Sequence, residues 1–393
     1  MPTPDKNSHA LLSPSGASRW LACTPSARLE AQFPDTAGVA AEEGTLAHKL
    51  GEALTAYHHQ MLPKAEYAKI IKEVEADPLY NLDMAGHAEN YAAFIAERFA
   101  EAKARTKDAV LQLESCLNMT EYVPEGYGTG DTVIIADHTL EIIDLKYGKG
   151  VRVSCEQNKQ MMLYALGALR DADYLYNIDT VLMTIYQPRL DNISSFEMSV
   201  KDLKNWAEIE LRPRAALAFE GLGEFVPGDH CRFCRARFQC KALADYNLEL
   251  AKYDFQEPVL LSDSDISDIL KRADAFTNWL SGIEEFALRE AIDNGKKWDG
   301  FKLVEGRSNR CYQDETLVAD KLVSNGYSED TIYSKKLLGI TAMEKAITKK
   351  EFSSLLSDLV IKPAGKPTLV PSDDKRPEWN STESAVNDFS NPE

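Results

Sequence analysis

The stretch Gly130–Tyr164 constrains the fold of this chain more than any other segment. It contains two short apolar runs separated only by the dipeptide Asp-His, which predicts two antiparallel strands joined by a tight turn. Asp131 stands before the first run, and Asp144 and Lys146 stand at the end of the second. Because side chains alternate along a strand, Asp144 and Lys146 project to the same side of the sheet. The segment therefore predicts two carboxylates and a lysine gathered at strand ends.

Two carboxylates and a lysine are the groups that metal-dependent phosphodiester cleavage requires. Carboxylate oxygens hold a hard divalent cation, and a lysine orients the attacking water or offsets negative charge. A D-x-K triplet is common by chance, and the alternative interpretation is a solvated strand end. Asp131 lies at hairpin distance from Asp144, and a helix with one polar face follows directly. These features make nucleic-acid cleavage the first hypothesis.

Apolar spacing and breaker residues along the chain predict a mixed sheet with helices packed on it. The predicted helices span 42–59, 82–105, 156–171, 202–219, 261–294, 314–325 and 341–356. The predicted strands span 110–119, 132–136, 139–145, 180–187 and 301–305.

Length, charge and apolar content limit the class of protein. A chain of 393 residues suffices for about two or three domains. It has no apolar run long enough for a membrane span and no N-terminal secretory pattern, so we expect a cytoplasmic protein without membrane association. The net charge of −18 argues against a large basic surface. Locally, however, 144–170 has five basic residues against two acidic ones, and 228–241 has four against one.

Four motifs together resemble the PD-(D/E)XK nuclease superfamily in its RecB-like branch. They are G-T-L-A-H ending at His48, G-T-G-D ending at Asp131, D-L-K from Asp144, and Q-x-x-x-Y from Gln160 to Tyr164. Their order and rough spacing match that branch over roughly residues 13–241. The combination is much more specific than any single motif.

The resemblance implies a restriction-endonuclease-like mixed central sheet flanked by helices and a complete metal site. His48, Asp131 and Asp144 would bind Mg²⁺ or Mn²⁺ with help from the Leu145 carbonyl. Oxygen ligands suit Mg²⁺, and one imidazole shifts the preference toward Mn²⁺. Lys146 would position the nucleophile, while Gln160 and Tyr164 would orient Lys146 or a phosphate. Without the family, His48 is an ordinary helix histidine and Tyr164 a core residue.

Three clustered cysteines form a second candidate site. Cys231, Cys234 and Cys240 follow the spacing C-x2-C-x5-C, which in a cytosolic chain is typical of metal ligands rather than disulfides. A tetrahedral site needs a fourth ligand. Zn²⁺ with His230 is one interpretation, and an iron–sulfur cluster with the distant Cys23 is the other.

The sequence around Cys23, S-x-x-x-R-W-L-x-C-x-P, resembles the N-terminal cysteine motif of RecB-like nucleases that carry a [4Fe-4S] cluster. These include the AddB nuclease domain and the CRISPR-adaptation exonucleases. The resemblance implies that Cys23, Cys231, Cys234 and Cys240 hold such a cluster, which we favour over Zn²⁺. Its role would be structural, closing a loop of about 200 residues at the boundary of the nuclease domain.

These observations predict four regions: a flexible N-terminus over 1–12, a nuclease domain over 13–254, a helical region over 255–365 and a disordered tail over 366–393. The region after 255 resembles the extension of a phage-encoded family of unknown function, found among replication and recombination genes.

The expected activity is a metal-dependent DNA exonuclease acting at single-stranded or resected ends. DNA is the expected partner, with a helicase or a single-stranded-DNA-binding protein as a further one that the resemblance implies. Two alternatives stay open. One is a non-catalytic module that binds DNA ends or a recombination partner, and the other is a zinc-stapled restriction-like endonuclease.

Overall fold

The computed structural model describes residues 10–34, 38–172, 176–249, 261–304, 315–326, 328, 332–333, 340, 343–344, 349–356 and 359–360. The helices are η1 (Pro14–Gly16), α1 (Ala17–Ala22), α2 (Ser26–Glu30), α3 (Val39–His58), α4 (Lys64–Glu75), α5 (Leu82–Arg105), α6 (Lys159–Ala172), η2 (Pro188–Leu190), α7 (Val200–Trp206), the π-helical turn η3 (Ala207–Leu211), α8 (Arg212–Glu220), η4 (Asp229–Phe233), α9 (Lys241–Leu248), α10 (Asp263–Asp293), α11 (Glu315–Ser324) and α14 (Lys349–Leu356). The strands are β1 (Val110–Asn118), β2 (Tyr127–Ala136), β3 (His138–Leu145), β4 (Ile178–Gln187) and β5 (Asn192–Ser199).

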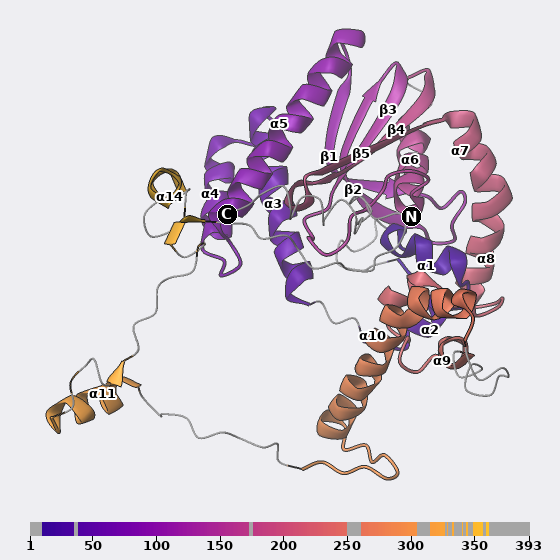
Figure 1. The fold of residues 1–393 in the computed structure, drawn as a ribbon. Coiled ribbons are helices and arrows are strands. Elements are labelled where there is room, and N and C mark those ends of the chain that lie inside the picture. Colours follow the sequence, from indigo (N-terminus) through magenta and orange to yellow (C-terminus); the bar gives the residue numbers. More distant parts are fainter. Residues whose placement is uncertain are drawn as a thin grey trace, which may run out of the picture. The chain divides into compact units, whose positions relative to one another are not determined.

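The five strands form one mixed sheet in the order β1-β2-β3-β4-β5 (Figure 1). Neighbouring strands are antiparallel except β3 and β4, which are parallel. A parallel pair needs a crossover connection, and α6 supplies it. The predicted mixed sheet flanked by helices is confirmed, as is the helical character of the C-terminal region.

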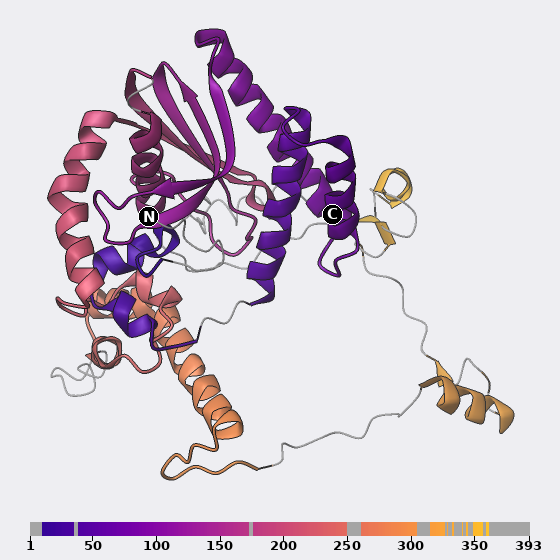
Figure 2. The ribbon, with the colours of Figure 1, turned by 180° about the vertical axis from the view of Figure 1, so that it is seen from behind.

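Helices cover both faces of the sheet (Figures 1 and 2). On one face α6 packs with α1, α7 and α8 in the largest core cluster, which includes Trp20, Met162 and Leu203. On the other face α5 packs on β2, and Ile95 and Ile134 are both fully buried there. α3 and α4 pack against α5 in a third cluster. The sheet is therefore covered by helices on both faces.

Helix α6 begins at a side-chain cap. Asn158 Oδ1 accepts hydrogen bonds from the backbone N–H groups of Gln160, at 3.1 Å, and Met161, at 3.3 Å. An Asn side chain that binds the first free N–H groups fixes a helix start. The helix accordingly begins at Lys159, three residues after the predicted start at Glu156. From Met161 to Leu169 every side chain is buried, which explains its apolar sequence.

Strand β2 extends further than the sequence predicts. It begins at Tyr127, so Asp131 lies inside the strand rather than before it. The added half contains two glycines and has no apolar alternation. The glycines are needed because a Cβ at Gly128 would lie 2.7 Å from Pro14, and one at Gly130 would lie 2.7 Å from Leu117. In this part of the strand the sequence therefore shows glycines, which leave room for the Pro14 and Leu117 side chains. It shows no alternation of apolar and polar residues.

Other predicted elements differ at the margins of the domain. Neither β5 nor α4 was predicted. β5 was missed because it is an edge strand with a polar sequence. The strand predicted over 301–305 is absent from its described residues, 301–304, because no described strand pairs with it and a lone strand is not stable. The predicted tail 366–393 and residues 1–9 lie outside the described residues.

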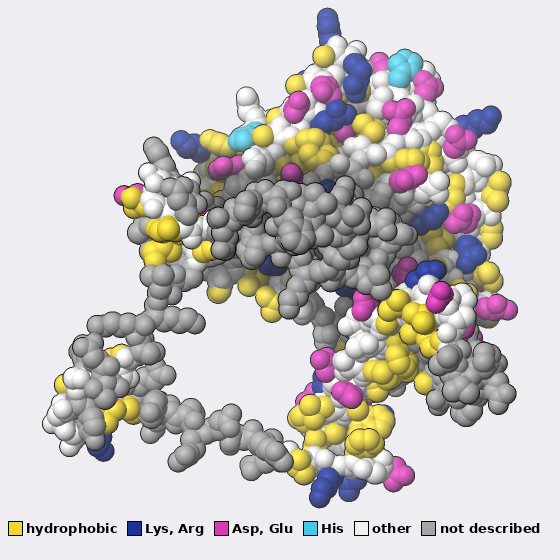
Figure 3. Space-filling view, viewed as in Figure 1, with side chains coloured by type: hydrophobic (Ala, Val, Ile, Leu, Met, Phe, Trp, Pro, Cys, Tyr) yellow, Lys and Arg dark blue, Asp and Glu magenta, His cyan; other side chains and the backbone are white. Residues whose placement is uncertain are grey.

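The chain divides into two compact units, Met1–Phe286 and Ala287–Glu393. The first contains the sheet, its covering helices and most of α10. There Gly282 of α10 lies against the Phe238 ring, and Trp279 Nε1 donates a hydrogen bond to the Arg237 carbonyl at 3.3 Å. Exposed apolar side chains, among them Leu270 and Leu280, are distributed along α10 (Figure 3). Among the described residues no helix has both the length and the apolarity of a membrane span.

Candidate functional site

Three carboxylates lie in one row across three neighbouring strands. The β1–β2 register places Glu114 opposite Asp131, because the pairs on either side are Leu113 with Thr132 and Ser115 with Gly130. The β2–β3 register, continued by one residue, places Asp131 opposite Asp144. Glu114 itself is not paired in the ladder, and its backbone is left-handed, with a φ of 46°. The sheet therefore gathers three acidic side chains from three separate segments.

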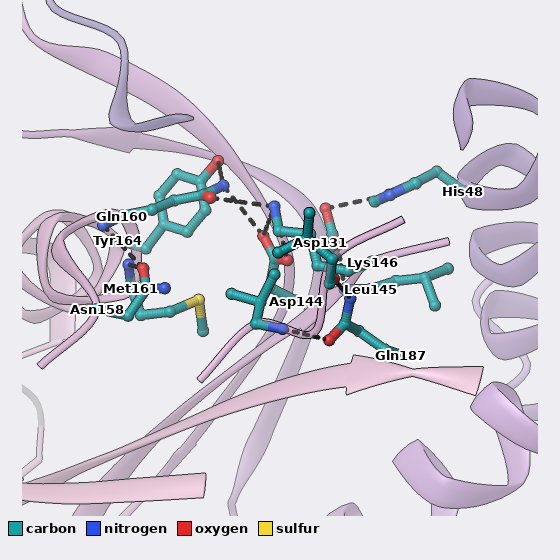
Figure 4. A network of polar contacts seen from close by, with 12 residues as sticks. His48, Asp131, Asp144, Leu145, Lys146, Asn158, Gln160, Met161, Tyr164 and Gln187 are labelled. Atoms are coloured by element: carbon teal, nitrogen blue, oxygen red, sulfur yellow. Dashed lines mark hydrogen bonds and ion pairs between the residues drawn. The ribbon is translucent and has the colours of Figure 1, made fainter. Parts of the chain in front are cut away.

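Asp144, Lys146, Gln160 and Tyr164 form one hydrogen-bonded network (Figure 4). Lys146 Nζ lies 3.0 Å from Asp144 Oδ2 and donates to Gln160 Oε1 at 3.0 Å. Gln160 Nε2 donates to Asp144 Oδ1 at 3.2 Å and to the Tyr164 hydroxyl at 3.1 Å. Gln160 and Tyr164 are four residues apart on α6, so they face the same side of the helix. The structure thus brings together four of the residues that the motifs single out.

The charges of Asp144 and Lys146 depend on each other. Burial raises the pKa of Asp144, while Lys146 lowers it and Asp131 raises it further. Burial lowers the pKa of Lys146, but the Asp144 carboxylate outweighs this effect and holds the pKa above its ordinary value. Lys146 therefore keeps its proton at neutral pH. It can act as a cation and a hydrogen-bond donor, and it is a poor general base.

Asp131 connects this network to helix α3. Its Oδ2 accepts a hydrogen bond from the Leu145 backbone N–H at 2.7 Å, and its Oδ1 lies 3.3 Å from His48 Nδ1. Burial by itself lowers the pKa of His48, but the charge and hydrogen bond of Asp131 raise that pKa to about 9. The structure therefore places His48, Asp131 and the Leu145 backbone side by side (Figure 4). The Leu145 carbonyl remains a predicted ligand.

The donor set fits a hard divalent cation. Carboxylate oxygens with one imidazole nitrogen suit Mg²⁺ or Mn²⁺. Asp144 Oδ2 is a buried atom that makes no hydrogen bond, although Lys146 Nζ is near enough for an ion pair. This oxygen keeps acceptor capacity that a buried polar atom normally uses. A cation beside it would satisfy that capacity.

Glu114 is a member of the site that the motifs do not indicate. One potential ligand atom from each of His48, Glu114 and Asp131 lies within 4.8 Å of the other two. The Glu114 side chain is exposed at its surface, yet desolvation by the groups around it raises its pKa to about 7, with Asp131 and Glu52 adding to the rise. Its sequence setting, Q-L-E-S, is that of any half-buried strand. Only the strand register could have identified it, and the sequence does not fix that register.

The segment between β3 and α6 is tied to the neighbouring strands. Gln187 (Figure 4) accepts a hydrogen bond at Oε1 from the Val153 N–H at 2.8 Å. Its Nε2 donates to the Val151 carbonyl at 3.0 Å. Arg152 Nε donates to Asn192 Oδ1 at 2.8 Å. Lys159 Nζ pairs with Glu210 at 3.4 Å. Arg152 and Lys159, part of the local basic excess, thus have partners within the fold.

The four cysteines of the second candidate site line one small cavity with a volume of about 20 Å³. Cys23 follows α1, Cys231 and Cys234 lie in and just after η4, and Cys240 precedes α9. All four are free thiols. Burial raises the pKa of Cys234 to about 12, so a bound metal must displace a proton there. The predicted grouping of one early and three late cysteines is present.

Polar contacts hold the two cysteine-bearing segments together. Glu30 is buried, forms an ion pair with Arg19 and accepts the Arg235 backbone N–H at 2.8 Å. Thr24 Oγ1 donates to the Leu222 carbonyl at 2.6 Å, and Arg28 Nε donates to the Phe219 carbonyl at 2.6 Å. These bonds join residues about 190 to 205 positions apart. His230, the alternative zinc ligand, binds the Val226 carbonyl through Nε2 at 2.9 Å.

Comparison with known proteins identifies a family and a distant structural match. A solved structure titled "Crystal structure of SSO0001" matches with 15% sequence identity and a TM-score of 0.20, covering 50% of this chain and 85% of that chain. The family described as "Protein of unknown function (DUF2800)" matches residues 9–377. The chain belongs to this family.

Proposed function

We propose that this protein is a metal-dependent DNA exonuclease that hydrolyses phosphodiester bonds, at single-stranded or resected ends during phage replication or recombination. The observation that carries the proposal is the network of Asp144, Lys146, Gln160 and Tyr164 beside Asp131 and His48. A protein that only binds DNA has no need for a buried acid–lysine pair next to a second carboxylate and an imidazole. The exonuclease and phage assignments derive from the sequence resemblance.

The carboxylates and His48 would hold the cation, and the remaining residues would place the substrate. When bound, a divalent cation lowers the pKa of water and stabilises the charge that develops on the phosphate. Lys146 donates one Nζ hydrogen to Gln160 and one to Asp144. Its ammonium group has a third, and its side chain is 30% exposed. That hydrogen can orient a water or a phosphate oxygen. Tyr164 accepts from Gln160 and fixes the amide that positions Lys146.

A [4Fe-4S] cluster on Cys23, Cys231, Cys234 and Cys240 is part of the proposal. All four cysteines line one cavity, as the ligands of a single bound group must. The preference for the cluster over Zn²⁺ derives from the sequence resemblance. A bound cluster would join the two segments that carry the cysteines.

The test is cleavage of end-labelled DNA with Mn²⁺ by protein purified without oxygen. We expect Asp144→Asn and Lys146→Ala each to lower the rate at least about 100-fold, since positioned charged groups contribute about that much. Asp137→Asn and Lys107→Ala are matched controls, because both residues are exposed and lie at the opposite end of the sheet. Equal rates for all variants would contradict the proposal.

The same assay separates the alternative functions. End-blocked linear and circular substrates distinguish an exonuclease from an endonuclease, because only the endonuclease cleaves a circle. Binding of DNA without turnover, unchanged by Asp144→Asn, would favour the non-catalytic binding module. Metal analysis that finds zinc rather than iron and sulfide would favour the zinc-stapled alternative.

A further inference from the structure

We propose that Glu114 is a ligand of the divalent cation and completes a three-donor site with His48 and Asp131. The motifs assign His48, Asp131, Asp144 and the Leu145 carbonyl to the cation and leave Glu114 without a role. The inference deepens the proposed function, and rests on it for the hydrolytic use of the cation. The binding site itself is argued from geometry and charge.

The three donors converge from three different elements. His48 lies on α3, Glu114 on β1 and Asp131 on β2, and one ligand atom of each lies within 4.8 Å of the other two. Ligands about 2.2 Å from one cation lie at most about 4.4 Å apart. The donors therefore need to move by only a few tenths of an ångström to bind one ion. Asp144 lies outside this three-donor group, since Lys146 and Gln160 hold its carboxylate, and its Oδ2, which makes no hydrogen bond, would be an additional donor to the cation.

The space between the donors suits a single ion. A cavity with a volume of about 10 Å³ is lined mostly by polar residues, together with Leu113 and Leu145, and this volume is close to what one water molecule requires. The three lining hydroxyl groups already have partners. Tyr91 and Thr132 bond each other at 2.9 Å, and Thr55 Oγ1 donates to the Gly51 carbonyl at 2.7 Å. Glu52 also lines the cavity, but only His48, Glu114 and Asp131, among the described residues, have ligand atoms within 4.8 Å of one another.

The negative charge of the carboxylates around the cavity would be offset by a bound cation. Glu114 and Asp131 line the cavity together with His48, and the Asp144 carboxylate adds to the negative charge that Glu114 experiences. The Glu114 carboxylate forms no hydrogen bond or ion pair with the part of the chain that the structure describes. Like charges this close repel one another unless a counter-charge is present. A divalent cation between Glu114 and Asp131 supplies that counter-charge.

The ligand set indicates which cation is preferred. Two carboxylates and an imidazole give two oxygen donors and one nitrogen donor. Nitrogen ligands favour later first-row ions over Mg²⁺, which prefers oxygen and keeps several waters. We therefore expect Mn²⁺ to bind more tightly than Mg²⁺ and Glu114 to contribute to the affinity for both.

The experiment measures Mn²⁺ binding to the metal-free full chain by titration calorimetry, without DNA. We expect Glu114→Gln to weaken Mn²⁺ binding at least about tenfold, because even outer-shell partners of a metal contribute about 10- to 100-fold in affinity. Glu52→Gln is the matched control, since Glu52 lines the same cavity but lies outside the three-donor group. It should weaken binding less than about threefold. Glu114→Asp, which keeps the carboxylate on a shorter stem, should fall between Glu114→Gln and wild type.

Two results would overturn the assignment: wild-type affinity in Glu114→Gln, or equal weakening by Glu114→Gln and Glu52→Gln. Absence of Mn²⁺ binding to the wild type would overturn it as well. Circular dichroism of each metal-free variant shows that a loss of binding is not a loss of fold. The proposed function fails separately. If Mn²⁺ binds through Glu114 but DNA is not cleaved, the ligand assignment stands and the nuclease assignment does not.

Discussion

At the scale of single residues, the site brings several carboxylates close together, and their mutual repulsion lowers the stability of the fold. Glu114, Asp131 and Asp144 lie on three neighbouring strands, and one His48 ring nitrogen lies within 4.8 Å of ligand atoms of the first two. The pKa of Glu114 is raised to about 7 and that of His48 to about 9. Desolvation is the largest cause of the first shift, with Asp131 adding to it, and the charge of Asp131 causes the second. Such sites often lower stability because their arrangement serves binding or chemistry.

Replacing Glu114 should therefore stabilise the metal-free protein. A carboxyl whose folded-state pKa is raised from 4.5 to about 7 destabilises the fold progressively as pH rises from about 4.5 to above 7. We expect Glu114→Gln to raise the free energy of unfolding by about 1 kcal/mol at pH 8, a value discounted for the exposure of this side chain. At pH 4.5 the difference should vanish. Thermal melts of both proteins at pH 8 and pH 4.5, in the presence of a chelator, measure this difference in unfolding free energy. An equal stabilisation at the two pH values would rule out this explanation.

Mn²⁺ binding should depend on pH through His48. With a pKa of about 9, the imidazole carries a proton at neutral pH that must leave before it can bind a metal. We expect affinity to rise as pH increases from 7 to 9, with about one proton released per ion. Titration calorimetry at pH 7.5 in two buffers of different ionisation enthalpy measures that release. His48→Ala should bind Mn²⁺ more weakly and release fewer protons per ion. A wild-type affinity for Mn²⁺ that does not change with pH would contradict the prediction.

At the scale of elements, the sequence predicts what local pattern controls and misses what pairing controls. Helix α5 spans the predicted 82–105 because its apolar residues recur at helical spacing. The β2–β3 hairpin follows from two apolar runs and a two-residue turn. The first half of β2 and the whole of β5 exist because a neighbouring strand pairs with them. Glu114 was missed for the same reason, since its place opposite Asp131 is a property of the register.

Helix α6 should position Lys146 through Gln160 rather than through Tyr164. Gln160 contacts both Lys146 and Asp144, whereas Tyr164 reaches them only through Gln160. We expect Gln160→Ala to lower kcat for DNA cleavage by about 10- to 100-fold, in line with residues that orient a site from outside it. Tyr164→Phe should have a smaller effect, and both should leave KM nearly unchanged. Steady-state kinetics of both variants measure kcat and KM. A larger loss of kcat in Tyr164→Phe than in Gln160→Ala would show that Tyr164, and not Gln160, positions Lys146.

At the scale of the whole molecule, the unit Met1–Phe286 joins the early part of its chain to a segment about 200 residues later. Glu30, Thr24 and Arg28 make these contacts around the cysteines. The sequence could predict that Cys23 and the later cysteines belong together only through the family resemblance, because no local pattern links residues so far apart. Apolar packing of α1 and α2 against α8 adds to these polar contacts, and a group bound by all four thiols would strengthen the attachment close to the cysteines.

Loss of Cys23 should release this attachment. A cross-link that closes a loop of about 200 residues stabilises a fold by up to about 5 kcal/mol, which corresponds to about 10 °C or more in Tm for a unit of this size. We expect Cys23→Ser, purified without oxygen, to contain less iron and sulfide, to melt earlier and to be cleaved by protease within 223–240. Cys116→Ser is the matched control, because Cys116 is exposed and remote from the other cysteines in sequence. Full iron content and an unchanged Tm in Cys23→Ser would remove Cys23 from the ligand set and with it the proposed link between the two segments.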